Sequence, residues 1–138
     1  MLARRPFSSR AELLAAATET WAQLTPADFR EAFTHHPEIG ANIDELRQKF
    51  ATTAAWSSAE QSAVLGANEA TLLALRDGNQ AYRARFGYSF IVCATGKSAQ
   101  EMLALLLARL SHEPELELSI AASEQAKITH LRLEKLCP

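Results

Sequence analysis

The chain has few cysteines and no large excess of charge of one sign. Cys93 and Cys137 are the only cysteines in 138 residues, and neither has a second cysteine close enough in sequence to form a metal-binding or redox pair. This pattern favours a reduced, intracellular setting. The formal net charge of -2 predicts no general attraction to nucleic acid or to an anionic membrane.

Long apolar runs are also lacking. The longest, from Met102 to Ala108, is far shorter than the roughly 20 residues that span a bilayer. Arg4 and Arg5 are followed by no long apolar segment, so a secretory signal is not predicted. We therefore expect a cytoplasmic protein with no membrane partner. The hydrophobic fraction of 48% and the length predict one globular domain over residues 1–138.

Capping signals and helical periodicity predict an all-α, single-domain bundle of about six to eight helices. Thr25-Pro26 with Asp28, and Ser98 with Glu101, are start signals in which a side chain caps the first turn. The expected helices cover about 11–21, 26–35, 43–55, 58–76 with an end at Asp77-Gly78, a segment opening after Ser98, and 114–136. Periodicity does not assign the apolar run 90–94 to a strand or a buried loop.

Histidine geometry selects one candidate for a polar pocket. At 100° per residue, the face that carries Phe29 and Phe33 also carries His36, whereas His35 points away from it. Pro37 restricts the chain after His36, which would hold the imidazole at the mouth of a cavity. The alternative is a histidine that only caps the end of the helix.

The segment from Ser57 to Gln61 carries a second set of polar groups. Helical projection places Ser57 and Gln61 among apolar residues such as Leu72, with Glu60 at the border of that face. A carboxylate there can accept hydrogen bonds from a ligand with urea or amide N–H groups. The same spacing of Ser57 and Glu60 is also that of a capping box, which would simply close the start of a helix.

Arg132 is the third polar candidate, because Ile128, Leu133 and Leu136 bracket it on a helical wheel and predict that it faces inward. An inward guanidinium needs an anionic partner. That partner is either the carboxylate of a ligand or a protein carboxylate such as Glu60, and the sequence leaves both open.

The irregular stretch around Phe90 and Ile91 offers backbone N–H groups that can point at ligand oxygens. The alternative is plain burial in the core, followed by a helix cap. Gly87 and Gly96 lie too far apart for a Walker phosphate loop.

Taken in order, these segments resemble one family, the 2-oxo-4-hydroxy-4-carboxy-5-ureidoimidazoline (OHCU) decarboxylases of urate degradation. The resemblance runs from about Arg5 to Leu136. The matching motifs are His36-Pro37 with Ile39-Gly40, Ser57-x-x-Glu60-Gln61, Asn79-x-x-Tyr82, Arg85-Phe86-Gly87, Phe90-Ile91-Val92, and Lys127-Ile128 followed by Leu131-Arg132-Leu133.

The resemblance implies an all-helical enzyme, often a homodimer, that needs no cofactor and no metal and releases carbon dioxide to give (S)-allantoin. It implies a catalytic role for His36 and Glu60. It also implies substrate-binding roles for Ser57, Gln61, Phe90, Ile91 and Arg132, the contacts at Phe90 and Ile91 being made by the backbone.

Family members usually carry a further helical segment before the Arg-Pro-Phe stretch, whereas this sequence begins only four residues before Arg5. Either a short natural N-terminus or a truncated chain would account for this difference. Two other functions also stay open at this point. One is a non-catalytic helical interaction module, in which the same polar residues form a structural network. The other is a decarboxylase or hydrolase of a related ureido or hydantoin acid.

Overall fold

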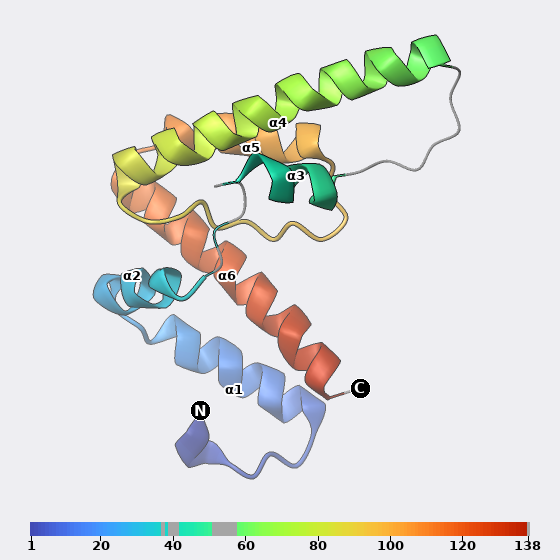
Figure 1. The fold of residues 1–138 in the computed structure, drawn as a ribbon. Coiled ribbons are helices and arrows are strands. Elements are labelled where there is room, and N and C mark those ends of the chain that lie inside the picture. Colours follow the sequence, from blue (N-terminus) through green and yellow to red (C-terminus); the bar gives the residue numbers. More distant parts are fainter. Residues whose placement is uncertain (37, 39–41, 51–57, 138) are drawn as a thin grey trace. The chain divides into compact units, whose positions relative to one another are not determined.

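The computed structural model describes residues 1–36, 38, 42–50 and 58–137, with the backbone alone for residues 58–67. These residues form helices and no β-strand, which confirms the all-α prediction (Figure 1). The elements are η1 (Leu2–Arg4), α1 (Arg10–Ala22), α2 (Pro26–Thr34), α3 (Ile43–Lys49), α4 (Ser58–Phe86), α5 (Ala99–Leu110) and α6 (Pro114–Leu136).

The chain divides into two compact units, each described by itself. Unit 1 comprises Met1–His35, Ile91–Cys93 and Glu115–Pro138, and unit 2 comprises His36–Phe90 and Ala94–Pro114. No helix in the described part of the chain is long and apolar enough to cross a membrane.

In unit 1, α1 and α6 pack antiparallel. Three contacts join them: Arg10 with Glu134 at 3.2 Å, Thr18 Oγ1 with His130 Nε2 at 2.8 Å, and Trp21 Nε1–H donating to the Ala122 carbonyl at 3.0 Å. In these pairs the residue number rises along α1 and falls along α6, so the two helices run in opposite directions. Buried alanines at positions 16, 17, 121 and 122 let the two backbones approach closely.

Helix α2 begins with a complete capping box. Thr25 accepts a hydrogen bond from the Asp28 amide, and the Asp28 carboxylate accepts from the Thr25 amide at 2.7 Å. Proline occupies the first helical position, as the sequence predicted. The Phe29 ring lies 4.9 Å from the Trp21 ring, which joins α2 to α1.

In unit 2, α4 and α5 lie side by side and run in the same direction (Figure 1). The contacts advance together along both helices: Gly78 meets Leu106, the Arg109 guanidinium lies 5.9 Å from the Tyr82 ring, and Arg85 donates to the His112 carbonyl at 2.9 Å. Because the helices are parallel, residues 87–98 must lead the chain back from the end of α4 to the start of α5.

The prediction that a helix ends at Asp77-Gly78 is wrong, because α4 continues to Phe86. Gly78 serves close helix packing instead: a Cβ there would lie 2.6 Å from Leu106 Cδ2. The glycine that follows the helix in a left-handed conformation is Gly87, with φ of 82°. Helix α3 ends at Lys49, whereas the sequence predicted an end near residue 55.

Phe90, Ile91, Val92 and Cys93 are all buried, and none belongs to a helix or strand. The apolar run that periodicity did not assign is therefore a buried loop. In unit 2, Tyr82 is fully buried and its ring lies 5.2 Å from the Phe90 ring and 4.6 Å from the Phe86 ring. Aromatic packing thus holds the start of this loop against α4.

Replacing Gly78 with alanine tests the close contact between α4 and α5. Alanine gains up to about 1 kcal/mol of helix propensity. Overpacking against the fully buried Leu106 costs about 1–3 kcal/mol. We expect Gly78→Ala to lower the free energy of unfolding by about 1 kcal/mol, measured by urea denaturation.

Leu106→Ala provides the matched background, because it removes the side chain that the new methyl group meets. In the Leu106→Ala background, Gly78→Ala should leave the free energy of unfolding unchanged or raise it. An equal loss of stability in both backgrounds would contradict the proposed contact.

The capping boxes predict a dependence of stability on pH. Hydrogen bonds from the backbone amide and then the hydroxyl of Thr25 lower the pKa of Asp28, and Ser98 does the same to Glu101. A carboxyl whose pKa is lower in the folded protein stabilises it above the unfolded pKa, and this contribution is lost as pH falls through the folded pKa. Thermal unfolding followed by circular dichroism from about pH 6 to about pH 3 should show a smaller fall in Tm for Asp28→Asn and Glu101→Gln than for the unsubstituted chain.

Candidate functional site

His36 lies two residues after the end of α2. Helix α2 ends at Thr34, and His35 is its C-cap, with its backbone N–H donating to the carbonyls of Ala32 and Phe33. His36 is half-buried, His35 is exposed, and Phe33 is buried. His36 is thus less exposed than His35, as predicted, and its place in a pocket stays a prediction. Pro37 lies outside the described residues.

Ser57 lies outside the described residues, so its predicted role is untested. Glu60 and Gln61 lie in the first turn of α4, where only the backbone is described. Their place on a helix agrees with the sequence, and their predicted contacts with a substrate stay predictions.

Phe90 and Ile91 are both buried, with exposed fractions of 6% and 0%. In unit 2, the Arg109 guanidinium lies 4.5 Å from the centre of the Phe90 ring, within the range of a cation–π interaction. The side chains of Phe90 and Ile91 are therefore buried in the core, as the alternative interpretation held. Backbone contacts with a substrate are compatible with this burial and stay a prediction.

Within unit 1, Glu124 binds the loop next to Ile91. The Cys93 backbone N–H donates to Glu124 Oε2 at 2.8 Å, and Lys127 Nζ lies 2.6 Å from Glu124 Oε1. The Glu124 side chain is only 15% exposed. Because a buried amide without an acceptor is costly, this carboxylate fixes the orientation of the peptide group at Cys93.

Arg132 is exposed on α6, so the prediction that it faces inward is wrong. The residues that defined its supposed apolar face do not form a core: Ile128 is half-buried and Leu136 is 76% exposed. An exposed guanidinium is available to an anion from solution. Its predicted role toward a substrate carboxylate is not tested by this exposure.

The structure also buries polar residues that the sequence analysis did not select. Arg109 and Asn79 are 5% and 7% exposed, and Glu117 is completely buried. Asn79 Nδ2 donates to the Leu75 carbonyl at 2.8 Å. The position of Arg109 could have been found, because it stands three residues after Leu106 and seven after Met102, both buried on α5.

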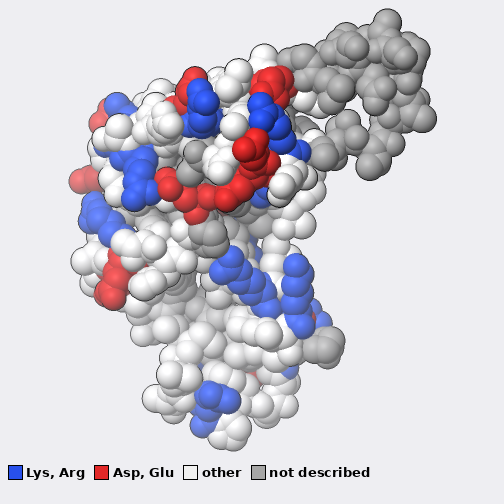
Figure 2. Space-filling model, in the orientation of Figure 1, with Lys and Arg blue, Asp and Glu red and all other residues white. Residues whose placement is uncertain are grey.

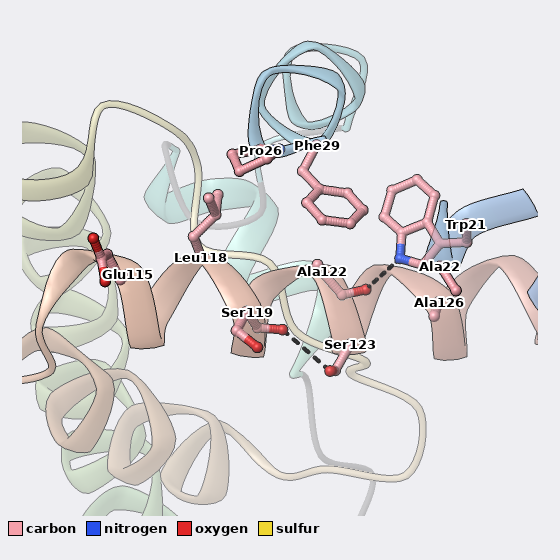
Figure 3. A pocket seen from close by; sticks show the side chains of 10 residues that line it. All are labelled: Trp21, Ala22, Pro26, Phe29, Glu115, Leu118, Ser119, Ala122, Ser123 and Ala126. Carbon is pink, nitrogen blue, oxygen red and sulfur yellow. Dashed lines mark hydrogen bonds between the residues drawn. The ribbon is translucent and has the colours of Figure 1, made fainter. Parts of the chain in front are cut away.

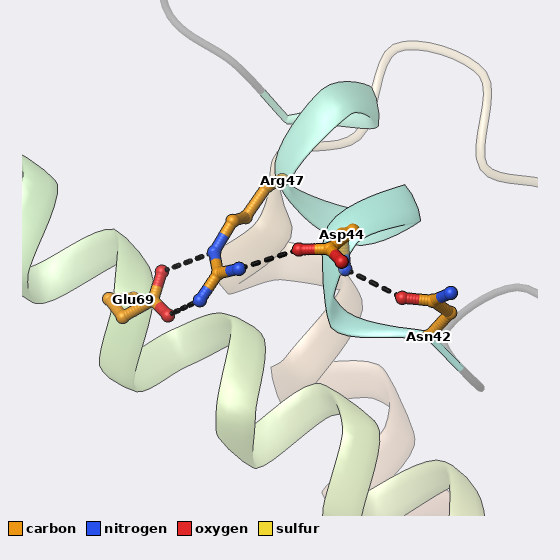
Figure 4. Close-up of polar contacts among 4 residues, drawn as sticks. All are labelled: Asn42, Asp44, Arg47 and Glu69. Carbon is orange, nitrogen blue, oxygen red and sulfur yellow. Dashed lines mark hydrogen bonds and ion pairs between the residues drawn. The ribbon is translucent and has the colours of Figure 1, made fainter.

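Ion pairs fix α3 on α4 (Figure 4). Arg47 donates from Nε to Glu69 Oε2 at 3.0 Å and from Nη2 to Glu69 Oε1, and its Nη1 lies 2.7 Å from Asp44 Oδ1. Hydrogen bonding to Arg47 lowers the pKa of Glu69, and its partner Glu69 raises the pKa of Arg47. Asn42 caps the start of the same short helix.

The face in Figure 2 shows basic and acidic side chains interspersed over α3 and α4. This mixture is consistent with the ion pairs of Arg47 and gives no broad field of one sign in this part of unit 2. Among the described residues, no cluster of three or more histidine, cysteine or acidic side chains could hold a metal ion.

Unit 1 contains an open pocket of about 380 Å³, formed by α1, α2 and α6 (Figure 3). Its walls include Trp21 and Phe29 on one side and Ser119 and Ser123 on the other. Trp21 Nε1–H is directed to the Ala122 carbonyl, and the Ser123 hydroxyl donates to the Ser119 carbonyl at 3.1 Å. Of the predicted site residues, Ile91 and Arg132 are described in unit 1, and neither lines this pocket.

Comparisons with known proteins agree with the helical architecture and with the family resemblance of the sequence motifs. A family model for OHCU decarboxylase matches residues 1–134. The chain is 38% identical over 133 residues to the uric acid degradation bifunctional protein TTL of Arabidopsis thaliana, covering 95% of this chain and 40% of that protein. It is 28% identical to the 2-oxo-4-hydroxy-4-carboxy-5-ureidoimidazoline decarboxylase of Amia calva, covering 97% of this chain and 77% of that protein.

A solved structure, that of an OHCU decarboxylase in the presence of (S)-allantoin, matches with a TM-score of 0.75 and 36% identity, covering 97% of this chain and 85% of that one. The helices of this chain and its match to that structure place it in the same all-helical class of protein. The chain belongs to the OHCU decarboxylase family. It spans less than half of the bifunctional plant protein.

Glu124 offers a test of how the loop at Cys93 is held. Glu124→Ala removes the acceptor of the Cys93 amide and should lower the free energy of unfolding by about 1–3 kcal/mol in urea denaturation. Glu124→Gln keeps an oxygen acceptor and should lose less. Equal losses in the two variants would show that the hydrogen bond to Cys93 is not what Glu124 contributes.

Proposed function

We propose that this chain is a decarboxylase that converts OHCU to (S)-allantoin in urate degradation. The observation that carries the proposal is the family match over nearly the whole chain, supported by 36% identity to an OHCU decarboxylase solved in the presence of (S)-allantoin. The sequence also carries the family motifs around His36, Glu60, Phe90 and Arg132, which adds to this support.

The substrate supplies its own electron sink. The carbon that bears the hydroxyl and the carboxylate adjoins a ring C=N bond. When the bond to the carboxylate breaks, carbon dioxide leaves and its electron pair passes into that C=N system. The nitrogen and the ureido-bearing carbon of that bond then each gain a proton, and the hydroxyl loses its proton to become a carbonyl, which gives allantoin. The protein must align the breaking bond with the C=N system and deliver the proton to one face.

His36 is the residue that we assign to proton transfer, either from the substrate hydroxyl or to the ureido-bearing carbon of the intermediate. Its half-buried place after α2 suits a group that meets both substrate and solvent. Glu60, with Ser57 and Gln61, would orient the ureido and ring groups through hydrogen bonds.

Two further groups would hold the anionic oxygens of the substrate. Arg132 can bind a carboxylate in a two-point fork, and its exposure on α6 supports its availability to a ligand. The backbone around Phe90 and Ile91 would supply amide contacts.

The proposal includes catalysis without a cofactor, because the substrate itself accepts the electrons. It also includes a homodimer, on the basis of the family resemblance alone, and a cytoplasmic location, on the basis of the two isolated cysteines. The second enzymatic candidate, a decarboxylase or hydrolase of a related ureido or hydantoin acid, is separated from the first by comparing substrates.

Substitution of His36 tests the proposal. OHCU is generated from urate immediately before use, and its loss is followed by ultraviolet absorbance and by the handedness of the allantoin formed. We expect the unsubstituted chain to give (S)-allantoin much faster than the spontaneous reaction. His36→Asn should lower kcat/KM by about a hundredfold or more, because it removes the proton-transfer group.

His35→Asn is the matched control, because the same change is made at the exposed neighbour. It should leave turnover unchanged. If the folded, unsubstituted chain does not accelerate loss of OHCU, the proposed function is wrong. If His36→Asn keeps full activity, the assignment of proton transfer to His36 is wrong.

A further inference from the structure

The segment that carries His36 is tied to α4 in unit 2. Arg83 Nη1 donates to Glu38 Oε1 at 2.8 Å, so the residue two positions after His36 is bound to the last turns of α4. Farther along the chain, Arg47 on α3 binds Glu69 on the same helix. Glu38 therefore lies near the end of α4, whereas Arg47 lies nearer its start.

The two attachment points are widely separated. At 1.5 Å per residue, Arg83 and Glu69 lie about 21 Å apart along the axis of α4. Arg47 fixes α3, whereas Glu38 stands two residues after His36 in the sequence. The Glu38–Arg83 ion pair is therefore the one placed to influence the histidine.

This ion pair contributes little to folding. The side chains of Arg83 and Glu38 are 59% and 34% exposed, and ion pairs exposed to this degree are screened by solvent. It can nevertheless limit the movement of a short segment. In the sequence only a proline separates Glu38 from His36, and the proline ring removes one backbone rotation between them.

Proton transfer depends strongly on geometry, since misplacement of a group by about 1 Å can cost as much as a hundredfold in rate. We propose that Glu38, held by Arg83, is a positioning residue that fixes His36 for proton transfer. This inference rests on the proposed function, and it adds two residues that do not touch the substrate.

The first test compares Glu38→Gln with Glu19→Gln. Glu19 forms an exposed ion pair of the same kind, with Arg4 at 2.9 Å in unit 1, and so controls for the loss of one surface charge pair. Glu38→Gln should lower kcat about tenfold and change KM by less than about twofold, because the substrate still binds but His36 is less well placed. Both variants should keep the Tm of the unsubstituted chain, and Glu19→Gln should keep its kcat.

Reversal of the pair supplies a rescue. The double variant Glu38→Arg with Arg83→Glu restores an ion pair of opposite polarity and should recover most of the lost kcat. An unchanged kcat in Glu38→Gln, an equal loss in Glu19→Gln, or a double variant no better than the single one would overturn the proposal.

A readout that does not need turnover separates this inference from the proposed function. NMR of ¹³C-labelled histidine follows the His36 ring, assigned with His36→Asn, in each variant. If the unsubstituted chain fails to act on OHCU, the proposed function has failed. Displaced His36 signals in Glu38→Gln, but not in Glu19→Gln, would still support positioning, whereas unchanged signals in both would overturn it.

Discussion

The architecture of unit 2 depends on the close contact between Gly78 and Leu106. A side chain at Gly78 would meet the fully buried Leu106, so only glycine lets α4 and α5 approach at this distance without displacement. Because the two helices are parallel, the chain must return over residues 87–98 before α5 can begin. The irregular loop that contains Phe90 and Ile91 is therefore a consequence of helix direction. Tyr82 and Phe86 on α4 provide the aromatic surface that receives its start.

Local signals in the sequence predicted the helix starts well. Thr25 with Asp28 and Ser98 with Glu101 each form the capping box that their spacing predicts, because the partners lie within one turn. The end of α4 was predicted wrongly for a complementary reason. Asp77-Gly78 has the local character of a helix end, but Gly78 is explained by a contact with α5, and a contact between segments distant in sequence leaves no local pattern.

The candidate site was predictable to a similar extent. His36 is half-buried and His35 is exposed, as the sequence predicted, although α2 ends at Thr34, before either histidine. Periodicity failed at Arg132, because the apolar residues around it lie near the end of α6, where Leu136 is itself largely exposed. The roles of Glu124 and Arg83 could not be read from periodicity, because each depends on a partner far away in the chain.

The continuity of α4 through Gly78 has a consequence for how the family can vary in length here. One uninterrupted helix of 29 residues carries Glu60 in its first turn, Glu69 opposite α3 and Arg83 near its end. Insertion or deletion of a single residue within an α-helix rotates everything beyond it by about 100° and shifts it by about 1.5 Å. Glu69 and Arg83 lie about 40° apart around the helix axis, and one such change between them would turn one of these side chains away from the face that they share. Substitutions can therefore accumulate along α4, but its register cannot change by one residue without separating the segments that it aligns.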